Sequence, residues 1–176
     1  MTSWEQPVVM RTASAKDAPL VMQFLRELAE YEHLSDTVFL TEETLRHWLE
    51  TEQIGVLFAG CHEETVGFAL YYKTYATFRG QRGLYIEDLF VRPEFRRRGI
   101  GRMFFRELAR LAVDQGYFRM DWMVLNWNKN SIEFYEKLGG CPVCDWTTYR
   151  LQGTALLSLA EKSDHSGGQR EDAGSR

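Results

Sequence analysis

The stretch Ile86–Gly101, IEDLFVRPEFRRRGIG, joins an apolar, β-prone run to three consecutive arginines and two glycines. Apolar residues at helical spacing follow it directly, so it predicts a strand that turns sharply into a helix. Two adjacent acids, Glu87 and Asp88, interrupt the apolar run. In a regular strand one of them would face the core, where a carboxylate is costly unless it is hydrogen-bonded. Either both acids lie at a bulge or rim, or at least one lines a cleft.

The turn Arg96–Gly101 has the composition of an anion site. Its glycines let the backbone turn sharply and approach a ligand closely. The first amides of the following helix lack partners within the helix, and with the helix dipole they favour an anion. Arginines add bidentate donors for phosphate oxygens. The turn therefore predicts a pyrophosphate cradle, with a solvated charged surface as the alternative, and it lacks the lysine and hydroxyl of a P-loop.

Hydrophobic periodicity predicts a mixed α/β chain on both sides of this junction. Strands are expected at residues 8–10, 56–60, 66–72, 84–91, 120–125 and 146–151. Helices are expected at residues 17–31, from Thr41 onward, at 99–115 and at 130–138. The length suits one domain, placed over residues 7–160. Residues 161–176 have almost no side chain able to pack, so a disordered tail is expected there.

Composition narrows the classes of protein and partner. The chain has 176 residues, 44% of them hydrophobic, and a formal net charge of −4. That charge argues against a nucleic-acid partner, since such proteins are usually basic. No apolar run approaches the ~20 residues of a membrane span, and residues 1–6 do not resemble a signal peptide. A cytoplasmic protein without a membrane partner is expected.

Metal and redox chemistry are not expected. Cys141 and Cys144 have C-x-x-C spacing, but no second pair completes a zinc site. They follow two glycines and do not open a helix, so reduced thiols are expected, with a redox pair as the alternative. His62 stands beside two glutamates between two predicted strands, which favours a solvated turn over a metal ligand.

The pattern [QR]-x-x-G-x-[GA], here Arg96 to Gly101, resembles the acetyl-CoA motif of the GNAT superfamily of N-acetyltransferases. Four segments are similar to its spermidine/spermine (diamine) N-acetyltransferase branch, which includes thialysine and ornithine acetyltransferases: RELAEYEHLSD, VGFALYYKTY, YIEDLFVRPEFRRRGIG and LNWNKNSIEFYEKLGG. The resemblance covers about residues 8–160. It implies the α/β GNAT fold: a mixed sheet of six to seven strands, about four flanking helices, and splayed central strands that form the acetyl-CoA cleft.

The resemblance also implies roles for individual residues. Glu87 would take the amine proton through water, and Tyr135 would protonate the departing thiolate. The implied acetyl-CoA contacts are Leu89, Phe90, Val91, Arg96, Arg97, Arg98, Gly99, Ile100, Gly101, Arg102, Asn128, Lys129, Asn130 and Ser131. The implied substrate contacts are Tyr31, Glu32, Glu87, Asp88, Asp121, Trp122 and Met123, with Tyr31 and Glu32 coming from the second subunit of a homodimer. The alternatives are a core aromatic for Tyr135 and a solvated helix face for Glu32.

The implied reaction is acetyl transfer from acetyl-CoA to a primary amine of a small cationic substrate. Polyamine-acetylating members carry an acid in the segment matching Thr74–Phe78 and another before the last strand, and this chain has neither. A short diamine or a basic amino acid such as lysine, thialysine or ornithine is therefore favoured, and Arg79 and Arg82 would meet a substrate carboxylate. Polyamine or protein N-acetylation, and acyl-CoA sensing without turnover, are the alternatives. Glu87 and Tyr135 together argue against a sensor.

Overall fold

The computed structural model describes residues 7–161, and contacts within the chain divide them into two units. The first unit ends at Leu138 and the second begins at Gly139. One domain over residues 7–160 stays a prediction. The tail expected at residues 161–176 lies, apart from Glu161, outside the described residues.

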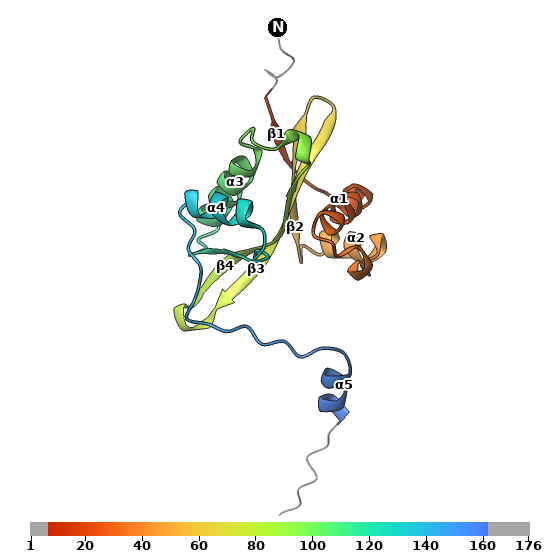
Figure 1. Cartoon of the computed structure of the whole chain (residues 1–176), viewed down its shortest axis with the longest axis vertical. Helices are drawn as coiled ribbons and strands as arrows, with labels where there is room; N and C mark the ends of the chain where they lie inside the picture. Colours follow the sequence, from red (N-terminus) through yellow and green to blue (C-terminus); the bar gives the residue numbers. More distant parts are fainter. Residues whose placement is uncertain (1–6, 162–176) are drawn as a thin grey trace, which may run out of the picture. The chain divides into compact units, whose positions relative to one another are not determined.

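A five-stranded sheet whose strands follow sequence order forms the centre of the first unit (Figure 1). The strands are β1 (Val9–Thr12), β2 (Gly55–Cys61), β3 (Glu64–Ala76), β4 (Gln81–Val91) and β5 (Met120–Trp122). Strands β1 to β4 are antiparallel to their neighbours, whereas β5 is parallel to β4. A parallel neighbour needs a crossover connection, and the helix that follows β4 supplies it.

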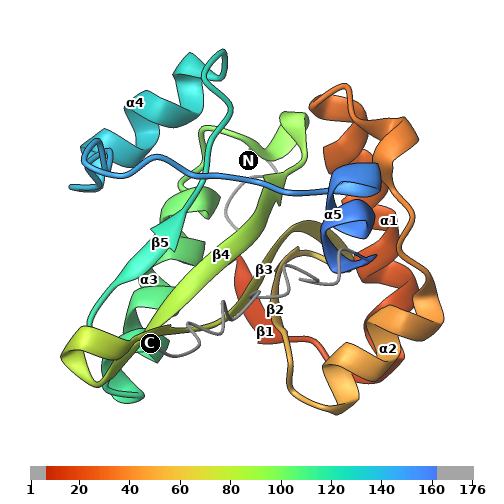
Figure 2. The ribbon, with the colours of Figure 1, turned by 90° about the horizontal axis from the view of Figure 1, so that it is seen from below.

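Helices cover both faces of this sheet (Figure 2). The helices α1 (Ala18–Tyr31) and α2 (Glu42–Glu50) pack on one face, and α3 (Ile100–Asp114) and α4 (Lys129–Lys137) lie on the other. Because side chains alternate along a strand, the sheet feeds two cores. Phe58 and Phe68 join the core under α1 and α2, while Leu84 and Ile86 join the core under α3.

Sequence-local signals set the helix ends. The Thr41 hydroxyl accepts a hydrogen bond from the Thr44 amide (3.2 Å) at the start of α2, as expected for a capping residue. The Asn128 amide oxygen accepts one from the Ser131 amide (3.3 Å) at the start of α4. Gly99 precedes α3 with φ of 80°, a conformation that glycine adopts without strain.

The second unit contains α5 (Gly153–Glu161), and the strand predicted at residues 146–151 is wrong. Trp146 and Tyr149 give this segment a β-prone composition, but it has irregular backbone and exposed side chains. Composition alone does not make a strand, because a strand needs a hydrogen-bonded neighbour. The described residues therefore contain five strands, fewer than the six to seven expected, and five α-helices, one more than expected. Strand β5 also ends at Trp122, short of the predicted Leu125.

The structure shows where the candidate metal and thiol residues lie and whether a described helix could cross a membrane. His62 is exposed in the β2–β3 turn. The thiols of Cys61, Cys141 and Cys144 are all free. Within residues 7–161 no cluster of three His, Cys, Asp or Glu side chains is arranged to hold a metal ion. No helix in the same range combines the length and apolar character that crossing a bilayer requires.

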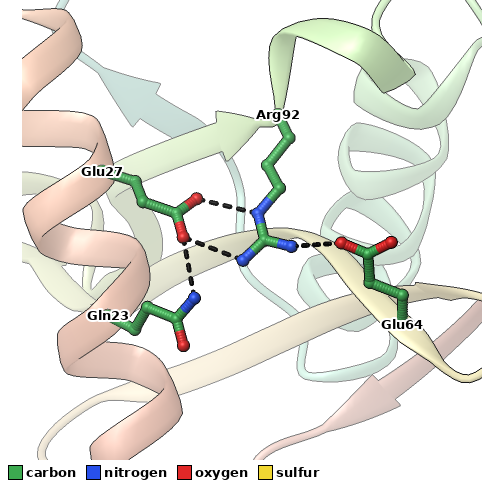
Figure 3. Close-up of polar contacts among 4 residues, drawn as sticks. All are labelled: Gln23, Glu27, Glu64 and Arg92. Carbon is green, nitrogen blue, oxygen red and sulfur yellow. Dashed lines mark hydrogen bonds and ion pairs between the residues drawn. The ribbon is translucent and has the colours of Figure 1, made fainter.

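One polar network fastens α1 to the sheet (Figure 3). Arg92, the first residue after β4, donates from Nε and Nη2 to the two carboxylate oxygens of Glu27 at 2.9 and 2.8 Å. Its Nη1 donates to Glu64 at the start of β3 (2.5 Å), and Gln23 donates to Glu27 at 2.9 Å. The Arg92 side chain is only 17% exposed, so this bidentate pair is stronger than an ordinary surface ion pair.

Arg92→Met should lower the free energy of unfolding by about 2–4 kcal/mol, because it leaves Glu27 partly buried without its partner. Urea unfolding measures the loss, and the double variant with Glu27→Met should recover part of it. Arg110→Gln removes a pair whose arginine is 63% exposed, and it should cost less than about 0.5 kcal/mol. An unchanged urea midpoint for Arg92→Met would contradict this assignment.

Candidate active site

A β-bulge in β4 places both acids on one face of the sheet. Leu70 of β3 pairs with Asp88 and the next residue, Tyr71, pairs with Ile86, so Glu87 is an extra residue in β4. Ile86 and Leu89 both pack on the α3 side. Their neighbours Glu87 and Asp88 therefore both point to the opposite side, where α1 lies. Of the two interpretations left open by the sequence, the bulge is confirmed.

The bulge coincides with the end of pairing between β4 and β5. The last of the three pairs joins Ile86 to Trp122, one residue before Glu87. From Glu87 to Val91 the β5-facing edge of β4 has no neighbouring strand among the described residues, and a strand edge of this kind presents unpaired N–H and C=O groups. The expected splaying of the central strands is confirmed. Leu89, Phe90 and Val91 lie along the opened part.

The first amides of α3 have no hydrogen-bond partner within the helix. The helical hydrogen bonds begin with the Met103 amide donating to the Gly99 carbonyl (3.0 Å), so the amides of residues 100–102 precede the ladder. A Cβ added at Gly99 would meet nothing within 4 Å. A Cβ at Gly101 would lie 3.2 Å from the Phe134 ring, so this glycine allows α3 to approach α4 closely.

The arginines of this turn have different surroundings. Arg96 donates to the Val91 carbonyl (2.8 Å), and its guanidinium lies over the rings of Tyr31 (4.4 Å) and Phe90 (5.4 Å). The side chain of Arg98 donates to the Glu94 carbonyl (2.8 Å).

For the other two arginines of this turn, the structure gives no comparable hydrogen bond among the described residues. Arg97, at φ of 62°, and Arg102 in the first turn of α3 form no ion pair within residues 7–161. Of the four predicted phosphate-binding arginines, these two are therefore the available ones.

Tyr135 of α4 lies among aromatic rings beside the opening. Its ring centroid is 5.3 Å from that of Trp122 and 5.6 Å from that of Phe105. Burial raises the pKa of Tyr135 to about 12, and the nearby Glu32 and Tyr31 add to the shift. The phenol therefore stays protonated at neutral pH. Packing and a role as a proton donor are compatible here, because the ring is only half-buried.

The two bulge acids lie in an unusual electrostatic environment. Tyr72 donates a hydrogen bond from its hydroxyl to Glu87 (3.0 Å). Burial raises the pKa of Asp88 to about 7, and the charges of Glu87 and Glu32 add to the rise. Burial also raises the pKa of Glu32, which follows the last residue of α1. A carboxyl that titrates near neutral pH is suited to accepting a proton.

Tyr31 and Glu32, expected from a second subunit, meet groups of their own chain in the structure. The Tyr31 ring lies 6.2 Å from Phe90 and 6.2 Å from Trp127. Glu32 interacts electrostatically with Asp88 and Tyr135. One chain thus brings together most of the predicted substrate-side and catalytic residues.

The other predicted residues are more spread out. Asn128 is buried and caps α4, while Lys129 and Asn130 are exposed in its first turn beside the half-buried Ser131. Trp122 packs edge-on against Phe105 (4.9 Å) as part of the α3-side core. Met123 follows β5 and is 64% exposed.

Asp121 has a partner that the sequence analysis missed. Its carboxylate forms an ion pair with Arg119, whose Nε lies 2.6 Å from the carboxylate oxygen, so it does not add an uncompensated negative charge. Tyr72 and Tyr85, also missed, are opposite each other on β3 and β4 and stack with ring centroids 5.2 Å apart. Their alternation with the neighbouring apolar residues was the signal that could have placed them on the face of Glu87.

Known proteins are similar to this chain in sequence. Residues 20–140 match the acetyltransferase (GNAT) family. A thialysine N-epsilon-acetyltransferase of Caenorhabditis elegans is 36% identical over 154 residues, which cover 86% of this chain and 96% of that protein. L-ornithine N5-acetyltransferase NATA1 of Arabidopsis thaliana is 40% identical over 93 residues, which cover 53% of this chain and 41% of that protein.

A solved structure agrees in fold. The integron cassette protein VCH_CASS6 from the mobile metagenome of V. cholerae superposes with a TM-score of 0.74 at 27% identity, and the match covers 89% of this chain and 99% of that one. The splayed strands, the glycine turn before α3 and the extent of these matches lead to one conclusion: the chain belongs to the GNAT family of acetyltransferases and is an N-acetyltransferase.

Proposed function

We propose that the chain transfers an acetyl group from acetyl-CoA to the primary amine of a small cationic substrate, a short diamine or a basic amino acid such as lysine, thialysine or ornithine. One observation carries the proposal. Pairing between β4 and β5 stops at Ile86, so the two bulge acids lie where the strands separate. Tyr135 lies beside the same opening, against Trp122 at the end of β5.

The residues around the opening fit the parts of acetyl-CoA. The unpaired β4 edge at Leu89, Phe90 and Val91 offers backbone groups to the amides of the pantetheine arm. The first amides of α3 and the guanidinium groups of Arg97 and Arg102 suit the pyrophosphate. When bound, the thioester supplies the acetyl group; orientation and proton transfer remain tasks of this chain's residues.

The amine must first lose a proton. A lysine-like ammonium has a pKa near 10.4, so at pH 7 only about one in 2,500 molecules is a free nucleophile, and freeing the amine costs roughly 4.6 kcal/mol. Glu87, held by the Tyr72 hydroxyl, accepts that proton through water. Asp88 supports it, because a carboxyl with a pKa of about 7 can hold the proton and release it near neutral pH.

Tyr135 acts on the leaving group. An ammonium loses two protons in becoming an amide: one leaves through the acid pair, and a second restores the thiol through the Tyr135 hydroxyl. A thiol has a reference pKa near 8.5, so a phenol with a pKa of about 12 is a weak donor. A thiol held in the same buried surroundings would also have a raised pKa, which would narrow the difference between the pKa values of donor and acceptor.

The competing functions differ in what they need from the site. A long polyamine needs several uncompensated carboxylates, and the pairing of Asp121 with Arg119 removes one of them. Acyl-CoA sensing needs no proton acceptor or donor, whereas the chain has both, Glu87 with Asp88 and Tyr135. Protein N-acetylation stays an alternative that direct comparison of lysine with a lysine-containing peptide tests.

The catalytic role of Tyr135 can be tested by measuring turnover. With acetyl-CoA, the chain should release free thiol in the presence of lysine, thialysine, ornithine or a short diamine. Tyr135→Phe should lower kcat by on the order of 100-fold or more, since it removes only the proton donor. Calorimetric acetyl-CoA affinity should change by less than about threefold.

Tyr117→Phe is the matched control, because it removes a half-buried hydroxyl that follows α3 and should leave kcat unchanged. An unaltered kcat in Tyr135→Phe would remove the catalytic assignment. Absence of acetyl-CoA binding by the folded chain would remove the proposed function as a whole.

The burial of Asp88 makes stability depend on pH. Asp88 ionises near pH 7 in the folded chain and near pH 4 when unfolded, so the folded state loses stability as the pH rises from about 4 to 7. Asp88→Asn removes that loss. Its stability relative to the parent should rise by roughly 3 kcal/mol between pH 5 and pH 8, as measured by urea unfolding.

Asp36→Asn, which removes an exposed carboxyl after α1, should show a constant difference from the parent over that range. A constant difference for Asp88→Asn as well would show that Asp88 carries no burial cost.

We also propose that the chain is a homodimer. Every described residue of the second unit except Gly140 is exposed, including Val143, Trp146, Tyr149, Leu151, Leu156, Leu157 and Leu159. Exposed apolar surface of this extent is typical of protein interfaces. Light scattering should give twice the chain mass of 20.6 kDa. Leu157→Glu should shift the mass toward that of the monomer, whereas Val113→Glu, at an equally exposed position on α3, should not.

A further inference from the structure

We propose that the Arg119–Asp121 ion pair binds the zwitterionic head of an amino-acid substrate, and that this pair selects a basic amino acid over the diamine of the same length. This inference rests on the proposed function and assigns the substrate class of that site. Arg119 would hold the α-carboxylate and Asp121 the α-ammonium, while the side-chain amine reaches Glu87 and Asp88.

The pair lies on the same face of the sheet as the bulge acids. Asp121 is opposite Tyr85 in the parallel register between β5 and β4, so the two side chains share a face. Tyr85 and Glu87 are two residues apart and also share that face, which places Asp121 one side-chain repeat along the sheet and one strand across from Glu87. Burial raises the pKa of Tyr85, and the charges of Glu87 and Asp121 add to the rise, as expected for a ring between them.

A missing side chain leaves space for Arg119. A Cβ added at Gly83 would lie 3.3 Å from Cγ of Arg119 and 2.8 Å from Oγ1 of Thr74. The aliphatic part of the Arg119 side chain therefore lies against β4 at Gly83, where any larger residue would have to displace Arg119 or Thr74. Its guanidinium also lies over the Phe118 ring (4.9 Å), which fixes its plane.

Spacing favours a lysine-like substrate. Two residues along a strand span about 7 Å and neighbouring strands lie about 4.8 Å apart, so the backbone positions of Asp121 and Glu87 are separated by roughly 8–9 Å. The side-chain nitrogen and the carboxylate carbon of extended lysine are six bonds apart, a span of roughly 7–8 Å. Tyr85 lies beside both charged ends, and its ring, stacked on that of Tyr72 at an interplanar angle of 26°, offers an apolar surface for the methylene chain.

Charge distinguishes the two substrate classes. The carboxylate of Asp121 lies against Nε of Arg119. The two terminal nitrogens of the guanidinium therefore keep N–H donors for a bidentate contact with a substrate carboxylate. A zwitterionic head satisfies both members of the pair. The far ammonium of a diamine meets Asp121 but is also repelled by Arg119, so it gains little.

Further positive charge lies at the same end of the sheet. Arg79 lies over the Phe118 ring at 5.4 Å and Arg82 over the Tyr75 ring at 5.7 Å, and neither forms an ion pair within the described part of the chain. These are the two arginines that the sequence predicts for a substrate carboxylate. Arg119 has the stronger case, because its contact with Asp121 places a donor and an acceptor side by side.

The test compares substrates that differ by one group: lysine with cadaverine, which is lysine without its carboxylate, and lysine with lysine methyl ester. The parent chain should prefer lysine to both by about 10- to 100-fold in kcat/KM, mainly through KM, because a charged hydrogen-bond pair has that effect. Arg119→Gln should lose most of this preference by raising KM for lysine, with much less change for cadaverine. Arg110→Gln, a matched change on the exposed face of α3, should preserve the preference.

The outcomes separate the inference from the proposed function. Equal kcat/KM of the parent for lysine, its methyl ester and cadaverine would overturn the inference and leave the acetyltransferase standing. Equal losses on lysine and cadaverine in a folded Arg119→Gln would do the same. Turnover of none of these amines, with acetyl-CoA bound, would overturn both. The methyl ester comparison needs no variant, so a parent chain that shows no preference for lysine overturns the inference even if Arg119→Gln fails to fold.

Discussion

The extra residue in β4 is the constraint on which the rest of the site depends. Without it, Glu87 and Asp88 would point to opposite faces, and one carboxylate would enter the core under α3. The bulge turns both toward α1, and it does so one residue beyond the last pair with β5. A single register shift therefore places two acids together and at the point where the strand edge becomes available to a ligand.

This arrangement is costly to the fold, and the surrounding contacts offset that cost. Two neighbouring carboxylates repel each other, and burial raises the pKa of Asp88 to about 7. The Tyr72 hydroxyl fixes Glu87 from the adjacent strand. Immediately after β4, Arg92 joins α1 to the start of β3 through two glutamates. The strand that carries the two acids is thus held just past its end by a separate network of ion pairs, which Arg92 forms with Glu27 and Glu64.

Local patterns in the sequence predict most of the elements but not their long-range contacts. The periodicity of α3 and α4, the capping of α2 and the apolar run of β4 are all local, and each was predicted. The strand predicted at residues 146–151 was wrong, because a strand depends on a neighbour that composition does not specify. The pair Glu87–Asp88 predicted an irregularity, but only the pairing with Leu70 and Tyr71 decides which residue is extra. Arg119 has no motif, and its position depends on Gly83, 36 residues earlier.

Arg96 shows why charge in a motif does not define its role. Its position in the turn predicts a phosphate contact, yet its guanidinium lies on Tyr31 and Phe90 and donates to the Val91 carbonyl. It therefore joins the turn before α3 to the end of α1, where Tyr31 and Glu32 lie. Any movement of that turn upon binding a pyrophosphate would be transmitted to Tyr31, since the cation–π contact and the hydrogen bond share one rigid group. Arg96 thus links the turn proposed to hold the pyrophosphate with the helix end proposed to contact the substrate, through a guanidinium that already lies over two aromatic rings.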